Sequence, residues 1–247
     1  FARSEEEPVD NEFIKVARHE RWAELILNRP QRRNALVGPL LTQLTEALGA
    51  LGQEQDLDAV VFRGEGGAFC SGHDLTELQA QPRPPWAENL ADIFRETNIA
   101  LFTFPKPIVG ALEKCAINAG AALALSCDIL IAGETAFLQV GEIQQGAGIT
   151  NNAAWLRLRA GEAVASRITL YGDRVSAPEL HRLGLAAEVV PDGDVVARAC
   201  ALAERFASFP PGAGARHKSD LRAQSGITDP QLWFRKQSSA VLLNAAR

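Results

Sequence analysis

The sequence has few of the residues and spacings that mark metal or redox sites. Its cysteines form no CxxC pair, and its four histidines lie far apart without an HExxH pattern. Because protein-bound metals need clustered ligands of this kind, no metal site is expected. The thiols are typical of buried free cysteines in a reducing compartment, so we expect a cytoplasmic protein. The four cysteines are Cys70, Cys115, Cys127 and Cys200.

Long apolar runs and basic clusters are missing as well. A membrane-spanning helix needs about 20 apolar residues, and no stretch approaches that length or has the layout of a signal peptide. The lysines and arginines are scattered and the formal net charge is -5, so neither a nucleic acid nor a membrane is expected as a partner. What the chain does have is 247 residues, 47% of them hydrophobic, which is enough to bury the core of one large domain.

The first part of the chain alternates predicted strands and helices. Phe13–Ala17 and Trp22–Leu27 suit the two strands of a hairpin. Pro39–Leu51 has apolar residues at helical spacing, with the proline acceptable in the first turn. Ala59–Phe62 and Ile108–Leu112 are short continuous apolar runs, which predict buried strands.

Two stretches of this first part resemble each other. Val60–Phe69 and Leu130–Phe137 both contain a strand, a glycine turn and then Ala-Phe. Helices are predicted at Glu88–Phe102 and Gly120–Cys127, and another strand at Asp128–Ala132. Repeated strand–turn units separated by helices predict a coil of repeating ββα turns.

Beyond Asn151 the pattern predicts helices only. This change predicts an α/β core over residues 11–190, followed by a helical C-terminal region over 191–247 that packs on a neighbouring subunit. Residues 1–10 are acidic and lack an apolar period, so we expect a disordered tail. The predicted helices are Ala153–Arg159, Gly161–Leu170, Ala177–Leu183, Asp192–Ser208, Ala213–Ala223 and Pro230–Ala246.

A glycine-rich turn follows the strand predicted at Ala59–Phe62. The segment Arg63–Leu75 reads RGEGGAFCSGHDL. Glycine permits unusual backbone angles and the close approach of a ligand. Such a turn can direct backbone N–H groups at an anion or a developing oxyanion. A glycine turn after a strand is most often just a turn, so this segment alone does not define a site.

Two later segments carry possible catalytic groups. Asn118-Ala119-Gly120 opens a helix of small residues, where unpaired N–H groups carry partial positive charge. Glu142 lies in an apolar and amide-rich stretch, where a carboxyl group with a raised pKa can act as a general acid or base. Taken singly, the first is also an ordinary packed helix, and the second an ordinary surface glutamate.

The order and spacing of these segments resemble the crotonase superfamily, which includes enoyl-CoA hydratases and isomerases. LNRPQRRNAL at 27–36 is similar to the family's N-terminal strand and turn, and RGEGGAFCSGHDL to its first oxyanion-hole loop. Residues 106–137 are similar to the strand, helix and strand that carry the second donor, and 141–143 fall where the family has its catalytic Pro-Glu-Ile. Residues 170–191 match another typical segment. The resemblance implies a crotonase-like spiral of ββα units.

The resemblance also implies roles for individual residues. The substrate would be an acyl-CoA thioester, with no permanently bound cofactor. Its carbonyl oxygen would be held by the backbone N–H groups of Ser71 and Ala119, and Glu142 would be the acid/base. A homotrimer or hexamer would be held by the C-terminal helices. The residues implied at the CoA path are Arg29, Arg33, Ser71, Gly72, His73, Asp74 and Ala119.

Departures from the family pattern decide which reaction we expect. A standard hydratase uses two glutamates, and the first would stand at Ala122, which cannot accept or move a proton. The usual Asn-Gly loop reads Glu113-Lys114, and the usual Pro-Gly turn reads Ile-Thr-Asn-Asn at 149–152. A single carboxylate is enough to move a double bond, so isomerase-type proton transfer is favoured. Hydration or another lyase or hydrolase reaction with a non-standard second group is an alternative, as is a non-catalytic acyl-CoA binder.

Other interpretations of the same residues are weaker. Ser71, His73 and Asp74 are too close in sequence to align as a hydrolase triad, and no GxSxG elbow is present. Gly146-Ala147-Gly148 lacks the preceding strand and third glycine of a dinucleotide loop. The wall of the acyl pocket is expected within Leu78–Ile93, which contains Trp86 and Leu90.

Overall fold

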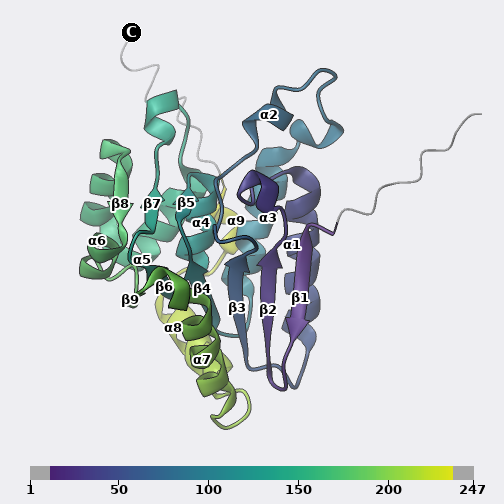
Figure 1. Cartoon of the computed structure of the whole chain (residues 1–247), viewed down its shortest axis with the longest axis vertical. Coiled ribbons are helices and arrows are strands. Elements are labelled where there is room, and N and C mark those ends of the chain that lie inside the picture. Colours follow the sequence, from purple (N-terminus) through teal and green to yellow (C-terminus); the bar gives the residue numbers. More distant parts are fainter. Residues whose placement is uncertain (1–11, 236–247) are drawn as a thin grey trace, which may run out of the picture.

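The computed structural model describes residues 12–235, which form two β-sheets wrapped by helices (Figure 1). The larger sheet has six strands in the order β1-β2-β3-β4-β6-β9, and β1 and β2 form the predicted antiparallel hairpin. All other neighbours in this sheet run parallel. Its strands are β1 (Ile14–Arg18), β2 (Trp22–Leu27), β3 (Ala59–Gly64), β4 (Ile108–Leu112), β6 (Ile129–Gly133) and β9 (Glu188–Val190).

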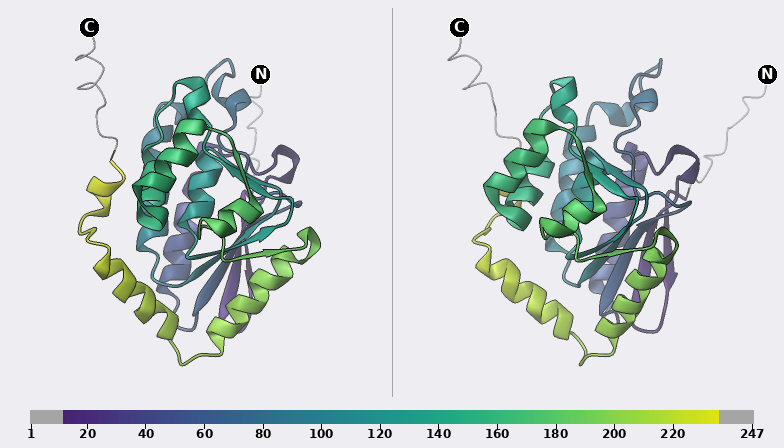
Figure 2. Two further views of the ribbon diagram at one scale, coloured as in Figure 1. Left: turned by 90° about the vertical axis from the view of Figure 1, so that its left-hand side faces the viewer. Right: turned by 60° about the vertical axis from the view of Figure 1, so that its left-hand side comes forward.

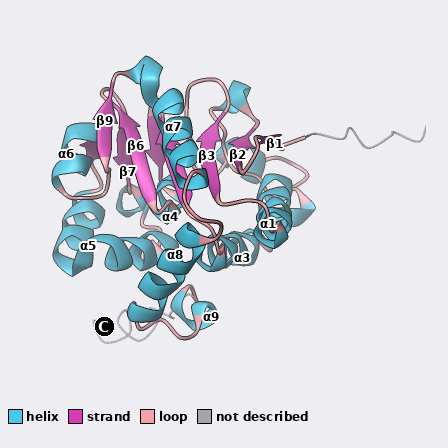
Figure 3. Cartoon of the chain, turned by 90° about the horizontal axis from the view of Figure 1, so that it is seen from below, coloured by secondary structure: helices cyan, strands magenta, loops and turns pink. Residues whose placement is uncertain are grey.

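Alternate residues of the six-stranded sheet point into two separate hydrophobic clusters. In β3, Val60 and Phe62 belong to the main cluster, whereas Ala59 and Val61 belong to the smaller one. The smaller cluster is completed by α7 (Val195–Ala207), which covers that face of the sheet (Figure 3). The strands are therefore buried on both faces, which explains their continuous apolar sequences.

The smaller sheet shows why the sequence has an internal repeat. It contains β5 (Cys115–Ile117), β7 (Phe137–Gln139) and β8 (Arg174–Ser176), with β7 in the middle. In the two similar stretches the first strand, β3 or β6, belongs to the large sheet, and the chain after β6 enters the small sheet as β7. Strands β4 and β5 follow the same course from the large sheet to the small one. The turn after β3 joins the same layer through a bridge between Cys70 and Ala116. The predicted ββα spiral is confirmed.

The helices lie close to the predicted positions. The spiral contains α1 (Gly38–Gln53), α2 (Leu75–Leu78), α3 (Leu90–Thr103), α4 (Ala119–Ser126), α5 (Thr150–Tyr171) and α6 (Ala177–Arg182). Short 3-10 helices are η1 (Pro30–Arg32), η2 (Pro85–Ala87), η3 (Glu142–Gln145) and η4 (Asp192–Asp194). The two helices predicted on either side of Ala160 form one kinked element, α5, with φ +74° at Gly161.

The prediction of helices only beyond Asn151 is wrong. Strands β8 and β9 lie within that part of the chain and complete the small and large sheets respectively. Each has only three residues, too few to show a strand period in sequence. Each forms because its backbone pairs with a neighbouring strand, β8 with β7 and β9 with β6. Their existence is therefore a consequence of tertiary pairing.

The C-terminal helices lie at the lower end of the molecule in Figure 2, where the chain turns back between α7 and the helices that follow it. After α7 come α8 (Ala213–Gln224) and α9 (Pro230–Trp233). Because α7 buries Val195, Ala199 and Ala203 against the large sheet, the predicted helical region begins as part of this chain's own core. Its role in oligomerisation remains a prediction. The predicted tail at 1–10, and the end of the helix predicted over Pro230–Ala246, lie outside the described residues.

None of the helices within residues 12–235 combines the length and the hydropathy that crossing a bilayer requires.

Candidate active site

Three segments that are distant in sequence line one cavity of about 620 Å³. They are the loop after β3, the β5–α4 junction, and η3 with the start of α5. Helix α3 and Phe234 form the remaining wall. Among the predicted site residues, the cavity brings together Ser71, Gly72, His73, Ala119 and Glu142.

Asn118 fixes the β5–α4 junction. It has φ +51° and ψ -113°, a conformation that costs free energy for any residue with a side chain. Its backbone N–H donates to the Gln139 carbonyl at 2.8 Å, and its Oδ1 accepts from the Gly141 N–H at 2.8 Å. Both bonds tie the start of α4 to the end of β7. Ala119 is the first residue of α4, so its N–H has no partner within the helix.

Helix α4 packs very closely against the loop after β3. A Cβ built on Gly120 would lie 2.5 Å from the Cys70 carbonyl oxygen and 2.9 Å from its Sγ. Only glycine permits this approach. Ala122 is completely buried on the same helix, so no second carboxylate is present at the position where the sequence lacked one.

Glu142 is the first residue of η3, between the small sheet and α5. Its Oε1 accepts a hydrogen bond of 2.8 Å from Asn152 Nδ2, which also donates to the Asn118 carbonyl at 3.0 Å. Its Oε2 is buried without a partner. Burial raises the pKa of the Glu142 carboxyl, and the hydrogen bond from Asn152 only partly offsets this. A raised pKa makes the Glu142 carboxylate a stronger proton acceptor, which suits a group that must accept and return a proton.

The N–H group of Ser71 is already used within the fold. It donates to the Arg33 carbonyl at 3.0 Å, and Ser71 Oγ lies 3.2 Å from the Arg32 carbonyl. This contradicts its expected role as a free oxyanion donor. Two residues later, the His73 N–H has no hydrogen-bond partner among residues 12–235. The loop therefore presents a free amide at His73.

Arg29 and Asp74 do not line the cavity but form a buried ion pair beneath the loop. Arg29 Nη1 lies 2.6 Å from Asp74 Oδ2, and each side chain is less than a tenth exposed. Asp74 Oδ1 caps α2 by accepting from the N–H groups of Thr76 and Glu77. Burial alone would raise the pKa of Asp74, but Arg29 and the Glu77 N–H hold it below its ordinary value. The pair stabilises the loop that carries His73.

Arg33 also lies outside the cavity. It adopts the left-handed conformation at the end of η1, with φ +50°, and its carbonyl receives the Ser71 N–H. Its expected contact with CoA remains a prediction, as do those of Arg29 and Asp74.

The acyl-side wall agrees only in part with the predicted segment. Leu78, Ala91 and Phe94 line the cavity. Trp86 instead lies over Gly38, where an added Cβ would be 2.6 Å from it, and Leu90 is buried in the main core. The sequence therefore identified the segment but not the side chains that face the substrate.

The His73 ring completes this wall. It meets Phe94 edge to face, with 5.1 Å between ring centroids. Burial lowers the pKa of His73 to about 4, so the imidazole is neutral at physiological pH.

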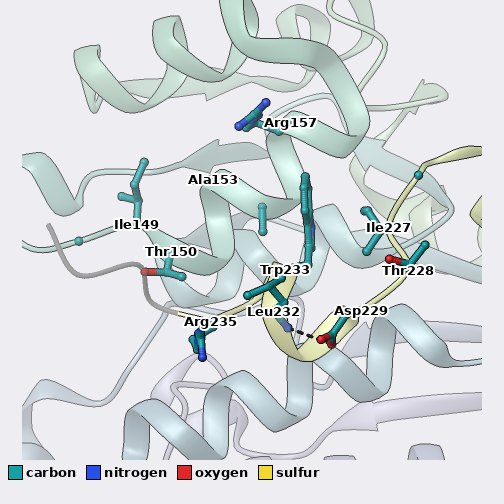
Figure 4. A pocket seen from close by; sticks show the side chains of 13 residues that line it. Ile149, Thr150, Ala153, Arg157, Ile227, Thr228, Asp229, Leu232, Trp233 and Arg235 are labelled. Atoms are coloured by element: carbon teal, nitrogen blue, oxygen red, sulfur yellow. Dashed lines mark hydrogen bonds between the residues drawn. The ribbon is translucent and has the colours of Figure 1, made fainter.

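A second hollow of about 610 Å³ lies beside the first and shares Gly148, Ile149 and Thr150 with it. Figure 4 shows Trp233 of α9 reaching toward Ala153 of α5 in this hollow. The C-terminal segment thus covers the outer side of the loop that leads from Glu142 into α5.

No role was assigned to Asn118, Asn152 or Arg95 from the sequence. Asn118 was visible only as the residue before the predicted helix, whereas Asn152 lies in the segment 149–152 that departs from the family's Pro-Gly turn, and that departure was the available signal. Arg95 has no local signal, because its place in the cavity depends on how α3 packs.

Comparison with known proteins agrees with this geometry. The sequence model of a protein family described as enoyl-CoA hydratase/isomerase matches residues 18–239. The chain is 34% identical to the 2,3-dehydroadipyl-CoA hydratase of Escherichia coli, over 89% of this chain and 88% of that protein. It is 32% identical to the 1,2-epoxyphenylacetyl-CoA isomerase of Escherichia coli, over 84% and 81%.

Solved structures give the same result. A crystal structure of an enoyl-CoA hydratase from a Polaromonas species superposes with a TM-score of 0.79 at 31% identity, covering 90% of this chain and 88% of that one. The chain therefore belongs to the enoyl-CoA hydratase/isomerase family of the crotonase superfamily, whose enzymes act on CoA thioesters.

Proposed function

We propose that the chain is an acyl-CoA isomerase that moves a double bond with a single acid/base, Glu142. The observation that carries this proposal is the hydrogen bonding of the Glu142 carboxylate. Glu142 lines the cavity with one carboxylate oxygen bonded to the Asn152 amide and the other buried, and fully buried Ala122 occupies the place of a second acid. Asp92 also lines the cavity, but its side chain is 67% exposed and paired with Arg95.

The thioester oxygen would be held by the N–H groups of Ala119 and His73. Both residues line the cavity, and neither amide has a partner among the described residues. Negative charge develops on that oxygen when a proton leaves the acyl chain. Preorganised N–H donors stabilise such an oxyanion by about 3 kcal/mol each in related sites. His73 thereby replaces Ser71 as the first donor.

The reaction then needs one proton and one base. The Glu142 carboxylate removes a proton from the carbon between the thioester and the double bond of a 3-enoyl-CoA. The electron pair left behind delocalises into the thioester and gives a dienolate. The same carboxyl group returns the proton to the terminal carbon of the dienolate, which gives the 2-enoyl-CoA. Asn152 holds Glu142 Oε1 throughout, and the Asn118 carbonyl holds Asn152.

Several expectations accompany this proposal. CoA itself is the carrier of the substrate, and the reaction as written requires no resident cofactor. Association into a trimer or hexamer and a cytoplasmic location both remain predictions.

A second candidate is hydration of a 2-enoyl-CoA. It is favoured because the 34% identical relative from Escherichia coli is a hydratase. The Oδ1 atoms of Asn151 and Asn152 are also buried and unpartnered at the cavity, where they could orient a water molecule in place of the absent glutamate.

Assays with 3-enoyl-CoA and 2-enoyl-CoA distinguish the two reactions. Isomerisation predicts conversion of the 3-enoyl-CoA to the 2-enoyl-CoA, detected by chromatography, and loss of this conversion in Glu142→Gln. Formation of hydroxyacyl-CoA from the 2-enoyl-CoA, with no shift of the 3-enoyl double bond, would refute the isomerase and support the hydratase.

A further inference from the structure

Unpartnered buried polar atoms are concentrated at the acyl cavity. Among the residues that the structure describes, seven buried side-chain nitrogen or oxygen atoms have no hydrogen-bond partner, and five of the seven belong to residues lining this cavity. Three are oxygens of Glu142 and the start of α5, one used in the proposed isomerisation and two in the alternative hydration. The other two are nitrogens on the loop after β3 and on α3, His73 Nδ1 and Arg95 Nε.

Arg95 lines the cavity, and its guanidinium nitrogens differ in their partners. Nη1 binds Asp92 at 2.7 Å and Nη2 binds Glu96 at 3.2 Å, while these two carboxylates are 67% and 47% exposed. Exposed pairs of this kind contribute little to stability. Nε, by contrast, is buried with no acceptor. A guanidinium nitrogen is always a donor, so this group requires an oxygen partner.

His73 offers a second nitrogen on the same wall. Its ring packs edge to face on Phe94, the residue before Arg95, with 5.1 Å between centroids. Its Nδ1 is buried and unpartnered. The neutral ring can donate from Nδ1 in one tautomer, so it can supplement Arg95 in binding an oxygen.

We infer that the cavity takes an acyl group bearing its own oxygen substituent, a hydroxyl or a carboxylate, bound by Arg95 Nε and His73 Nδ1. This inference rests on the proposed function only in that the ligand is an acyl-CoA. A plain hydrocarbon chain would bury both nitrogens without an acceptor. Sites built to bind a polar substituent discriminate strongly against analogues that lack it.

The charges near Arg95 are compatible with either of two oxygen substituents on the acyl group, a carboxylate or a hydroxyl. A carboxylate would gain from the positive guanidinium but would be opposed by Asp92 and Glu96, which already pair with it. A hydroxyl would accept from Arg95 without that repulsion. Both share the acceptor oxygen, and the ligands below separate them.

Binding of saturated, unreactive ligands tests the inference on the full chain. Hexanoyl-CoA, 6-hydroxyhexanoyl-CoA and adipoyl-CoA have the same number of acyl carbons and differ only at the far end. We expect one of the two oxygen-bearing ligands to bind at least about ten-fold more tightly than hexanoyl-CoA, measured by calorimetry. Preference for adipoyl-CoA identifies a carboxylate, and preference for 6-hydroxyhexanoyl-CoA a hydroxyl.

Three variants assign the preference to Arg95. Arg95→Met removes the donor and should abolish the ten-fold preference. Arg95→Gln keeps an N–H donor after a three-carbon stem without the charge, so it should retain a preference for the hydroxyl ligand and lose one for the carboxylate. Arg83→Met is the matched control, because Arg83 is exposed and lies outside the cavity lining. Its substitution changes the net charge by the same amount as Arg95→Met.

Equal or tighter binding of hexanoyl-CoA by the wild-type protein would overturn the inference. So would a preference that survives in Arg95→Met or disappears in Arg83→Met. Failure of the proposed isomerisation leaves these binding ratios unchanged, since none of the ligands can react. Absence of binding by all three CoA esters would overturn both proposals together.

Discussion

Two carboxylates, buried Asp74 and half-buried Glu142, have opposite hydrogen-bonding environments. Asp74 accepts hydrogen bonds on both oxygens and pairs with buried Arg29 at 2.6 Å. Glu142 has one amide partner and one buried oxygen without any. The pKa of Asp74 is accordingly lowered despite its burial, and that of Glu142 is raised by burial.

The difference separates a structural carboxylate from a chemical one. Protonation would cost a fully hydrogen-bonded carboxylate the free energy of those bonds. Asp74 therefore stays ionised and stabilises the loop after β3. A partly bonded one gains from protonation and can exchange its proton with a ligand. The satisfied group therefore positions the His73 loop, and the unsatisfied group lines the cavity.

The largest effect should come from removing the acid/base. We expect Glu142→Gln to lower kcat by about 10² to 10⁴ fold, the usual contribution of general acid–base catalysis. The glutamine oxygen can still accept from Asn152, so the melting temperature should not fall. Enzyme assays and thermal unfolding measure the two quantities. Full activity in Glu142→Gln would end the assignment of Glu142.

Asp74→Asn should show the opposite profile, a loss of stability before a loss of chemistry. The asparagine keeps the shape and can still cap α2, but it leaves Arg29 without its closest buried countercharge. Breaking a buried pair costs about 3 to 5 kcal/mol, which denaturant unfolding would measure. Glu77→Gln is the control, because Glu77 is 43% exposed and 3.2 Å from Arg29. Equal losses in the two variants would contradict the distinction.

His73 tests the pH dependence of the same loop. Burial lowers its pKa from 6.5 to about 4. The unfolded chain therefore takes up a proton that the native state refuses, and stability is lost as the pH falls from 6.5 toward 4. The expected loss is about 3 kcal/mol. His73→Phe should lose less between pH 7 and pH 4 in denaturant titrations; an unchanged loss would show that His73 is not responsible.

The smallest change is expected from Asn152→Ala. Its amide stabilises the ionised form of Glu142, so its removal should raise the pKa of Glu142 further. The acidic limb of the pH–rate profile should move to higher pH, with kcat near neutrality reduced about ten-fold. Asn151→Ala is the control, since Asn151 lines the same cavity but makes no hydrogen bond to Glu142. A shift of equal size in the control would refute the specific role of Asn152.

The sequence predicted the units of the fold better than the contacts between them. The runs at β3, β4 and β6 are continuous and apolar because both faces of the large sheet are buried, so they were visible in sequence. The strands β8 and β9 were not, because three residues carry no period.

The site shows the same division. Glu142, Ala119 and the absence of an acid at Ala122 were readable from order and spacing. That the Ser71 N–H is used by Arg33 was not readable, because the hydrogen bond joins residues 38 positions apart through the fold.

By itself, then, the sequence determined the family and the spiral of ββα units, and it singled out Glu142 as the proposed acid/base, because local composition and motif order carry that information. The tertiary structure alone decided which amides are free, which carboxylate is satisfied, and that Arg95 reaches the acyl cavity. Those properties depend on which distant groups become hydrogen-bond partners, and partners are assigned only when the chain packs.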